Sequence, residues 1–309
     1  AQISLISAVA RQYLALLATD EQLALARQTL DAAQRAYELN RATFEAGASS
    51  ELDLRTAETQ RAAVQANVVA LEQQRARNEN ALVLLIGTPL PADLPPAGSL
   101  ATQELLQDLP AGLPADLLQR RPDIRAAEHQ LQAATANIGA ARAAFFPSIK
   151  LTAFGGTGSA ELSGLFEKGS GRWSFAPSIT LPIFAAGRNK AQLDVAWIEQ
   201  RIEVANYQKA IQTAFREVAD ALAVRRLIDD EVAAQETRVA AAQRRYDLTQ
   251  LRFEGGVDSF LTVLLAQQEL YAAQQALIQT RFSRLANLTT LYAALGGGWQ
   301  EAPPASPEA

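Results

Sequence analysis

The feature that most constrains this chain is the absence of glycine and proline from long stretches. Neither residue occurs in 1–46, 48–86, 188–254 or 257–295. Because these residues most often interrupt helices, each stretch is predicted to form one continuous helix. At 1.5 Å per residue, 188–254 alone would form a rod roughly 100 Å long. Such a length predicts a coiled coil, a helical array or a membrane span, and the charges along the stretch exclude the span.

The helices belong to an internal repeat. Its copies are separated by a fixed offset of 209 residues, the difference between Gly256 and Gly47. The matched residues of the first copy are Tyr37, Leu39, Phe44, Glu45, Gly47, Ser50, Leu52, Ala57, Gln65, Asn78, Leu82 and Gly87. Those of the second are Tyr246, Leu248, Phe253, Glu254, Gly256, Ser259, Leu261, Ala266, Gln274, Asn287, Leu291 and Gly296. Each copy, 1–87 and 210–296, is predicted to be a long helix, a tight turn and a returning helix that ends at glycine.

Apolar residues recur every seven positions ahead of each turn. They are Leu23, Leu30, Tyr37 and Phe44 in the first copy, and Val232, Val239, Tyr246 and Phe253 in the second. A strict seven-residue repeat drifts around a straight helix, so it predicts left-handed supercoiling against neighbouring helices. An ordinary antiparallel coiled-coil scaffold is an alternative that this pattern leaves open.

The region between the copies has a different character. Residues 88–122 contain seven prolines and are predicted to form a connector with short helices. Beyond a further helix, apolar residues alternate with small or polar ones, which predicts a β-hairpin whose loop is the Gly- and Ser-rich segment 155–172. The predicted domains are a first helical hairpin (1–87), a connector (88–122), a helix (123–147), a β-hairpin (148–184), a second helical hairpin (185–296) and a disordered tail (297–309).

One face of the predicted β-hairpin is apolar. In its second strand this face carries Trp173, Phe175, Ile179, Leu181 and Ile183. Strands of about ten residues with one apolar and one small or polar face are typical of outer-membrane barrels, where the apolar face contacts lipid. A soluble hairpin packed on helices is the alternative, but the long helices at both ends leave little to pack against. Open sheet edges are not tolerated in lipid, so strands from elsewhere are expected to pair with this hairpin.

Composition argues against several other functions. The chain has one histidine, His129, and no cysteine, which excludes most zinc and thiolate sites. Its formal net charge is −5 and it has no basic run, so we expect no nucleic-acid partner. No catalytic constellation is found, and we predict neither enzymatic activity nor a cofactor or metal. The chain opens without methionine and within a helical pattern, so we expect an N-terminal part to be missing.

Four motifs resemble those of TolC-like outer-membrane factors. They are GLPADLLQRRPDIRAAE at 112–128, IGAARAAFFPS at 138–148, SITLPIF at 178–184 followed by Gly187 and Arg188, and FEGGVDS at 253–259. The resemblance covers essentially the whole chain. It is closest to the lipoprotein branch that serves resistance-nodulation-division pumps.

The resemblance implies a fold that is mainly α with a transmembrane β part. In this family, long antiparallel helical hairpins form a periplasmic α-barrel, and a homotrimer builds one 12-stranded outer-membrane β-barrel. By that pattern the chain lacks its first helix, its first β-hairpin and a lipidated cysteine. The implied function is a passive export duct in the outer membrane, with a periplasmic adaptor (membrane fusion protein) and an inner-membrane resistance-nodulation-division pump as partners. The alternative is a periplasmic coiled-coil adaptor or scaffold.

The resemblance also places both helical turns at the periplasmic mouth. We define the first tip as residues 44–53 and the second tip as residues 253–262. Adaptor contacts are expected at Gly47, Ser50, Gly255, Gly256 and Ser259. Glycine suits such tight reversals because it accepts a positive φ.

Four residues are candidates for a gate at that mouth. Asp53 and Asp258 follow the two turns, at places that we expect to be equivalent in the two copies, and a trimer would gather each into a ring of three carboxylates. The alternative is that each aspartate caps the helix that follows it. Arg245 and Tyr246 resemble a position used in gating contacts, although Tyr246 also fits the heptad core. Leu265 stands where related channels often carry a second acidic residue.

Overall fold

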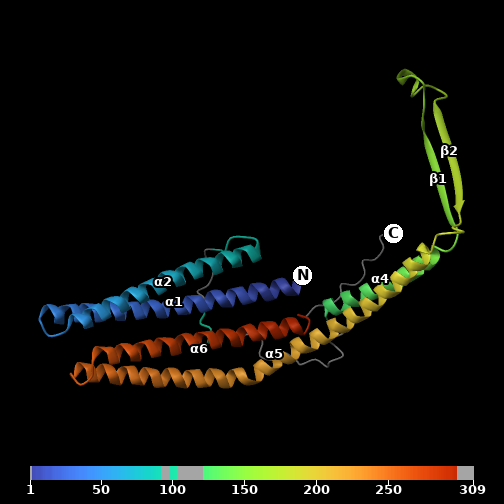
Figure 1. Cartoon of the computed structure of the whole chain (residues 1–309). Helices are drawn as coiled ribbons and strands as arrows, with labels where there is room; N and C mark the ends of the chain where they lie inside the picture. The colour runs from blue at the N-terminus through green and yellow to red at the C-terminus, as the bar shows by residue number, and fades with distance from the viewer. Residues whose placement is uncertain (1, 92–97, 104–120, 298–309) are drawn as a thin grey trace. The chain divides into compact units, whose positions relative to one another are not determined.

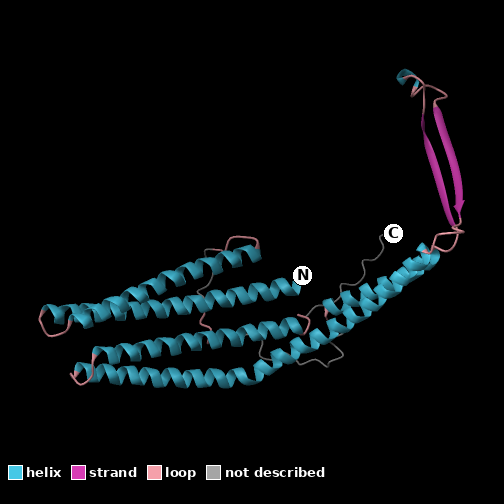
Figure 2. Cartoon of the chain, viewed as in Figure 1, coloured by secondary structure: helices cyan, strands magenta, loops and turns pink. Residues whose placement is uncertain are grey.

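The computed structural model describes residues 2–91, 98–103 and 121–297, and these form two compact units. Unit 1 comprises the described residues up to Arg121 together with those from Ala214 onward, and unit 2 comprises Pro122–Thr213. The elements, in chain order, are α1 (Gln2–Glu45), α2 (Glu51–Ile86), α4 (Pro122–Ala143), β1 (Ser148–Thr157), the 3₁₀ turn η1 (Leu162–Gly164), β2 (Gly171–Thr180), α5 (Arg188–Glu254) and α6 (Phe260–Ala294). A mainly helical fold with one β-hairpin is thereby confirmed (Figures 1 and 2).

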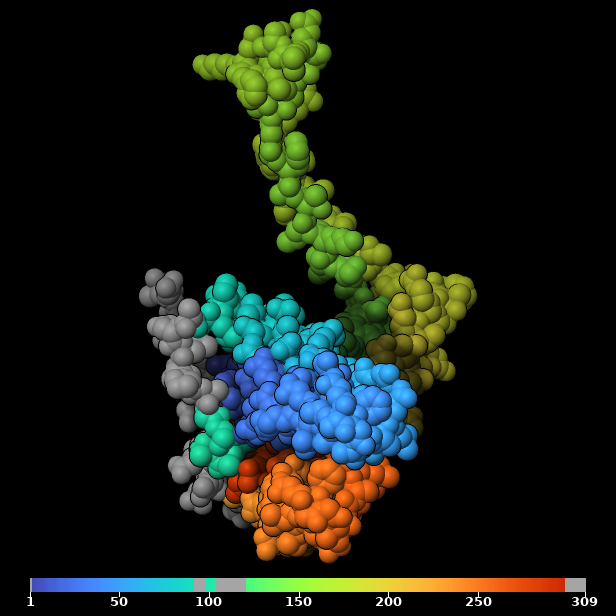
Figure 3. Space-filling view, turned by 90° about the vertical axis from the view of Figure 1, so that its left-hand side faces the viewer, coloured from blue at the N-terminus to red at the C-terminus, as the bar shows by residue number. Residues whose placement is uncertain are grey.

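Unit 1 contains both helical hairpins. The first is α1 with α2, and the second is the part of α5 from Ala214 onward with α6. Figure 3 views the two tips end-on, with the first tip (blue) beside the second (orange). None of the described helices combines the length and the apolar character that a membrane crossing requires. Most of the predicted connector lies outside the described residues, as do residues 112–120 of the first motif and the tail beyond Gly297.

Small and branched apolar residues form the core of unit 1. The largest cluster joins α1 to α6 and consists of Leu14, Leu17, Ala18, Leu100, Ile278 and Leu285. Inside the hairpins, alanines allow the paired helices to approach closely, since Ala26 and Ala273 have 0% of their surface exposed. The hairpins also meet through side-chain hydrogen bonds, such as Asn67 Nδ2 to the Tyr271 hydroxyl at 2.5 Å.

Ion pairs inside the two hairpins show the repeat at the level of single contacts. Arg75 binds Asp20 at 2.7 Å in the first hairpin, and their counterparts Arg284 and Asp229 are also 2.7 Å apart. A second matched pair exchanges its charges. Arg27 on α1 binds Glu72 on α2 at 2.8 Å, whereas Glu236 on α5 binds Arg281 on α6 at the same distance. The geometry of this contact is therefore retained in both copies, although the residue types have been reversed.

The exchanged pair leads to a test of stability. Arg27→Glu should lower the free energy of unfolding by up to about 1 kcal/mol, because it places two carboxylates together on an exposed surface. Adding Glu72→Arg should restore most of that loss, since the double variant copies the arrangement of the second hairpin. Chemical denaturation of the wild type and of the single and double variants measures both effects. A double variant no more stable than Arg27→Glu would show that the pair contributes nothing.

Unit 2 consists of α4, the β-hairpin and the adjoining part of α5. The strands are antiparallel, with Ser148 opposite Thr180 at one end and Thr157 opposite Gly171 at the other. Where the hairpin joins the helices, the Asn189 side-chain amide donates to the carbonyl oxygen of Ala144 at 2.9 Å. This bond satisfies a carbonyl beyond the C-terminal end of α4, which has no partner within the helix.

The extent predicted for the second strand was wrong at both ends. β2 starts at Gly171, inside the predicted loop, and ends at Thr180, so Leu181 and Ile183 lie beyond it. Thr180 is the last paired residue because its partner, Ser148, is the first of β1. Pro147 and Pro182 flank that last pair, and neither has an N–H with which to extend the ladder.

Candidate functional site at the two hairpin tips

Both helical turns have the same backbone hydrogen-bond pattern. In the first tip the N–H of Gly47 donates to Phe44 O and that of Ala48 to Thr43 O, both at 2.8 Å. In the second tip Gly256 donates to Phe253 O and Val257 to Arg252 O, again at 2.8 Å. This is the Schellman arrangement, which requires a left-handed residue after the helix. Gly47 and Gly256 fill that position with φ of 73° and 72°.

Gly255 differs from its neighbour in its conformational requirement. It is absent from the positive-φ residues, and its counterpart in the first copy is Ala46. A Cβ added at Gly255 would lie 3.5 Å from Leu251 O, which is ordinary contact. The turn therefore needs glycine at 256 but not at 255.

Two alanine substitutions separate these requirements. Gly256→Ala should lower the free energy of unfolding by about 1–2 kcal/mol, because an L-residue is strained in the left-handed region. Gly255→Ala should be neutral or stabilise by up to about 1 kcal/mol, since it restricts the unfolded chain. Thermal unfolding of the two variants provides the comparison. Equal losses would contradict the assignment of Gly256 as the left-handed residue.

The expected equivalence of Asp53 and Asp258 is wrong. With the offset of 209 residues, Asp53 corresponds to Thr262 and Asp258 to Ser49. Asp53 is the third residue of α2, whereas Asp258 precedes Ser259, the N-cap of α6. Both aspartates follow a turn, but they occupy different positions relative to the helix that comes next.

The two aspartates consequently have different partners. The Ser50 hydroxyl accepts from the Asp53 backbone N–H at 3.2 Å and donates to Asp53 Oδ2 at 2.6 Å, so Ser50 is the cap of α2. Asp258 instead accepts two bonds from the Arg252 guanidinium, from Nε at 2.8 Å and from Nη2 at 2.9 Å. Neither carboxylate acts as the N-cap itself.

The Asp258–Arg252 contact also has a counterpart in the first tip. Thr43 and Ser49 are the equivalents of Arg252 and Asp258, and the Thr43 hydroxyl donates to Ser49 Oγ at 3.1 Å. Each tip is therefore closed by one side-chain bridge across its turn. The bridge is neutral in the first tip and ionic in the second.

The ionic bridge should make the second tip sensitive to acid. Hydrogen bonding to Arg252 lowers the pKa of Asp258 below its ordinary value. Its stabilising effect is therefore complete above the unfolded pKa of about 4 and is lost as pH falls through the lowered folded pKa. Hydrogen exchange at 253–262 should accelerate relative to 44–53 over that window. The double variant Arg252→Thr with Asp258→Ser, which copies the first tip, should show no such difference, and a difference that persists would contradict the assignment.

The other two gate candidates have partners within their own hairpin. Arg245 on α5 forms an ion pair with Glu269 on α6. Tyr246 packs against the cluster of Ala242, Leu270 and Ala273, and burial raises the pKa of its hydroxyl. The position of Tyr246 is the one that the heptad pattern predicted.

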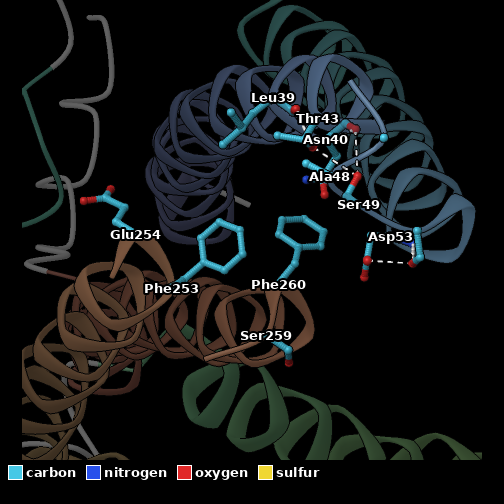
Figure 4. Close-up of a pocket in the computed structure, with 12 residues that line it drawn as sticks. Leu39, Asn40, Thr43, Ala48, Ser49, Asp53, Phe253, Glu254, Ser259 and Phe260 are labelled. Carbon is cyan, nitrogen blue, oxygen red and sulfur yellow. Dashed lines mark hydrogen bonds between the residues drawn. The ribbon is translucent and has the colours of Figure 1, made fainter. Parts of the chain in front are cut away.

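A cavity of about 700 Å³ separates the tips (Figure 4). Its polar lining residues include Asn40, Thr43, Ser49, Ser50, Asp53 and Ser259. Its apolar part includes Phe253 and Phe260, whose ring centroids are 6.0 Å apart. Sequence reasoning missed Phe260 and Asn40. Phe260 is replaced by Glu51 in the first copy, so the repeat gave no signal for it.

The residues predicted to face lipid are strongly exposed. Trp173, Phe175 and Ile179 lie on one face of β2 with 82%, 57% and 71% of their surface accessible. The opposite face carries Lys150 and Arg172, the only charged residues of the two strands. The charged residues of the two strands are thus confined to one face, which also carries Phe154. Among the described residues, no group of acidic or histidine side chains is arranged to hold a metal ion.

Comparisons with known proteins agree with this architecture. A family model described as outer membrane efflux protein matches residues 1–88 and 113–297. The toluene efflux pump outer membrane protein TtgF of Pseudomonas putida is 50% identical over 298 residues, which cover 96% of this chain and 62% of that protein. The cation efflux system protein CusC of Escherichia coli is 43% identical over 300 residues, 97% of this chain and 65% of that protein.

A solved structure gives the same result at the level of the fold. The open state of the Neisseria gonorrhoeae MtrE outer membrane channel matches with a TM-score of 0.78 and 43% identity, over 96% of this chain and 66% of that one. The chain thus spans less than two thirds of the length of the curated relatives named here. It belongs to the outer membrane efflux protein family.

Proposed function

We propose that this chain is part of an outer-membrane channel subunit, a passive duct that exports small molecules across the periplasm and outer membrane. It would act as a homotrimer with a periplasmic adaptor and an inner-membrane resistance-nodulation-division pump. The β-hairpin is the observation that carries this proposal. Every residue of both strands is exposed, yet one face is uniformly apolar or small except for Thr157. Such a surface suits lipid on one side and water on the other.

Family membership supports the duct over the alternative of a coiled-coil adaptor. The two helical hairpins would line the periplasmic part, and the β-hairpin would contribute two strands to the closed barrel. The relatives' names include toluene efflux and cation efflux, so relatives of similar identity are named for different solutes.

The two tips would form the periplasmic gate and the adaptor surface. Asp53 is the candidate for the carboxylate ring, and three subunits would place three such groups around the opening. Asp258 would reinforce the second tip through Arg252, and the Arg245–Glu269 pair and Tyr246 would stiffen the hairpin behind it. The adaptor would contact Gly47, Ser50, Gly255, Gly256 and Ser259, which lie in or beside the turns.

Reconstitution of the complete gene product tests the proposal. The protein should sediment with outer membranes, migrate as a heat-sensitive trimer in detergent and give stable single-channel currents in planar bilayers. Asp53→Ala should reduce the cation preference measured as a reversal potential in a salt gradient. Asp53→Asn removes the charge but can still accept the hydrogen bond from Ser50 at the start of α2. Comparing it with Asp53→Ala therefore separates the effect of the charge from the effect of that hydrogen bond. A soluble monomer without conductance would contradict the channel.

A further inference from the structure

One aromatic residue lies on the face of the β-hairpin that carries the charges. Phe154 points to the same side as Lys150 and Thr152 on β1, because residues two apart on a strand share a face. Across the hairpin this side carries Arg172, Ser174, Ala176 and Ser178. Phe154 is 62% exposed, and it is the only aromatic residue of either strand on that face.

Glycine gives the Phe154 ring its place on the strand. A Cβ added at Gly156 would lie 3.1 Å from Phe154 Cζ and 3.4 Å from Cε1, so the ring lies over the space that a side chain would occupy. Arg172 lies directly opposite Gly156 in the sheet. Its side chain covers Gly158, because a Cβ added at that glycine would lie 3.3 Å from Arg172 Cδ and Nε. Both side chains therefore extend along the sheet toward the loop at 158–170.

The charge on this face has one sign. Lys150 and Arg172 are its only ionisable residues, and neither strand contains a carboxylate. Phe154 and Arg172 are both exposed, and Arg172 lies opposite the residue two positions beyond Phe154 on β1. The loop toward which they extend lies at the end of the hairpin that is remote from α4 and α5 (Figure 1). An apolar surface is complemented by an apolar solute, and a cationic group is complemented by an anion.

We propose that Phe154 and Arg172 form a contact site for organic anions that pass through the duct. The inference rests on the proposed function, which places this face toward water inside the barrel. The ring of Phe154 contacts the apolar part of the solute, and Arg172 attracts its negative charge. In a trimer, three copies at one level would form a selective zone at the outer end, separate from the carboxylates of Asp53.

Current block in planar bilayers tests the site with the complete trimer. Naphthalene-2-sulfonate, added on the side of the 158–170 loop, should block at a lower concentration than methanesulfonate, which has the charge without the rings. Phe154→Ala should raise the half-blocking concentration of the aromatic anion about two- to tenfold, as expected for loss of one aromatic contact. Arg172→Gln should raise it as well and should abolish the preference over naphthylmethylammonium. Phe166→Ala, which removes an aromatic residue of the loop, is the control and should change neither value.

The outcomes distinguish this inference from the proposed function. Stable currents with unchanged block in both Phe154→Ala and Arg172→Gln would overturn the contact site and leave the channel intact. Absence of currents from the wild type would instead contradict the channel itself. If Phe154→Ala does not assemble, Phe154→Leu tests the same contact, because it retains apolar volume and lacks the ring. Equal block by both sulfonates would also overturn the site.

Discussion

Phe175→Arg should prevent stable insertion of the protein into the outer membrane, whereas Ala176→Arg should be tolerated. The two residues are adjacent in the middle of β2 and face opposite sides, with Phe175 opposite Ala153 and Ala176 opposite Thr152. An arginine that faces lipid at mid-depth costs about 2–4 kcal/mol. Ala176 shares its face with Lys150 and Arg172, so an arginine there joins a surface that already carries charge.

Ile179→Arg adds a test of depth. Ile179 lies one residue from the end of β2 on the same apolar face, where the cost of arginine should fall to about 0–1 kcal/mol. Outer-membrane fractionation and the yield of heat-sensitive trimer should therefore rank the variants, with Phe175→Arg lowest, Ile179→Arg intermediate and Ala176→Arg closest to wild type. Equal yields from Phe175→Arg and Ala176→Arg would rule out the assignment of the apolar face to lipid.

The helical part of the fold was predictable because its signals are local. Glycine at 47 and 256 is required by the φ of a single residue, and the stretches without glycine or proline continue without interruption up to those turns. The offset of 209 residues then located both hairpins without any knowledge of their packing. Continuity and turn chemistry are properties of neighbouring residues, so they can be read directly from the sequence.

The end of β2 was less predictable because strand pairing depends on a partner. Alternation of side chains continues through Leu181 and Ile183, and counting alone extended the strand to them. Pairing stops at Thr180 because β1 begins at Ser148 and nothing before Ser148 is paired with β2. A pattern in one strand contains no information about where its neighbour starts.

The tips show a similar limit for the candidate site. Asp53 and Asp258 are the same residue type and both lie close to a turn. In the structure, however, Asp53 accepts a hydrogen bond from Ser50, whereas Asp258 accepts hydrogen bonds from Arg252. The offset itself would have shown that the two aspartates are not equivalent, because Asp258 aligns with Ser49. What the offset could not provide is the rotamer that brings Arg252 across the turn.

Leu285→Ala should be among the most destabilising single substitutions in unit 1. Leu285 is 1% exposed and lies in the cluster that joins α1 to α6, with Leu14, Leu17 and Leu100. Removing three buried carbons both loses apolar burial and leaves a cavity, which together lower the free energy of unfolding by about 2–5 kcal/mol. The counterpart of Leu285 in the first copy is Ala76, which is exposed. A leucine at 285 therefore marks the face on which the second hairpin meets the first.

Leu52→Ala is the matched control, since it deletes the same atoms from a side chain that is 75% exposed and should cost no more than about 0.5 kcal/mol. Chemical denaturation measures both losses. Hydrogen exchange then locates them, because a weakened joint between the hairpins should accelerate exchange in α1 and α6 while the contacts of α1 with α2 persist. If Leu285→Ala were as mild as Leu52→Ala, the α1–α6 cluster would not be the joint that holds the two hairpins together. The copies would then be joined by side-chain hydrogen bonds, among them Arg11 to Thr290 between α1 and α6 and Asn67 to Tyr271 between α2 and α6.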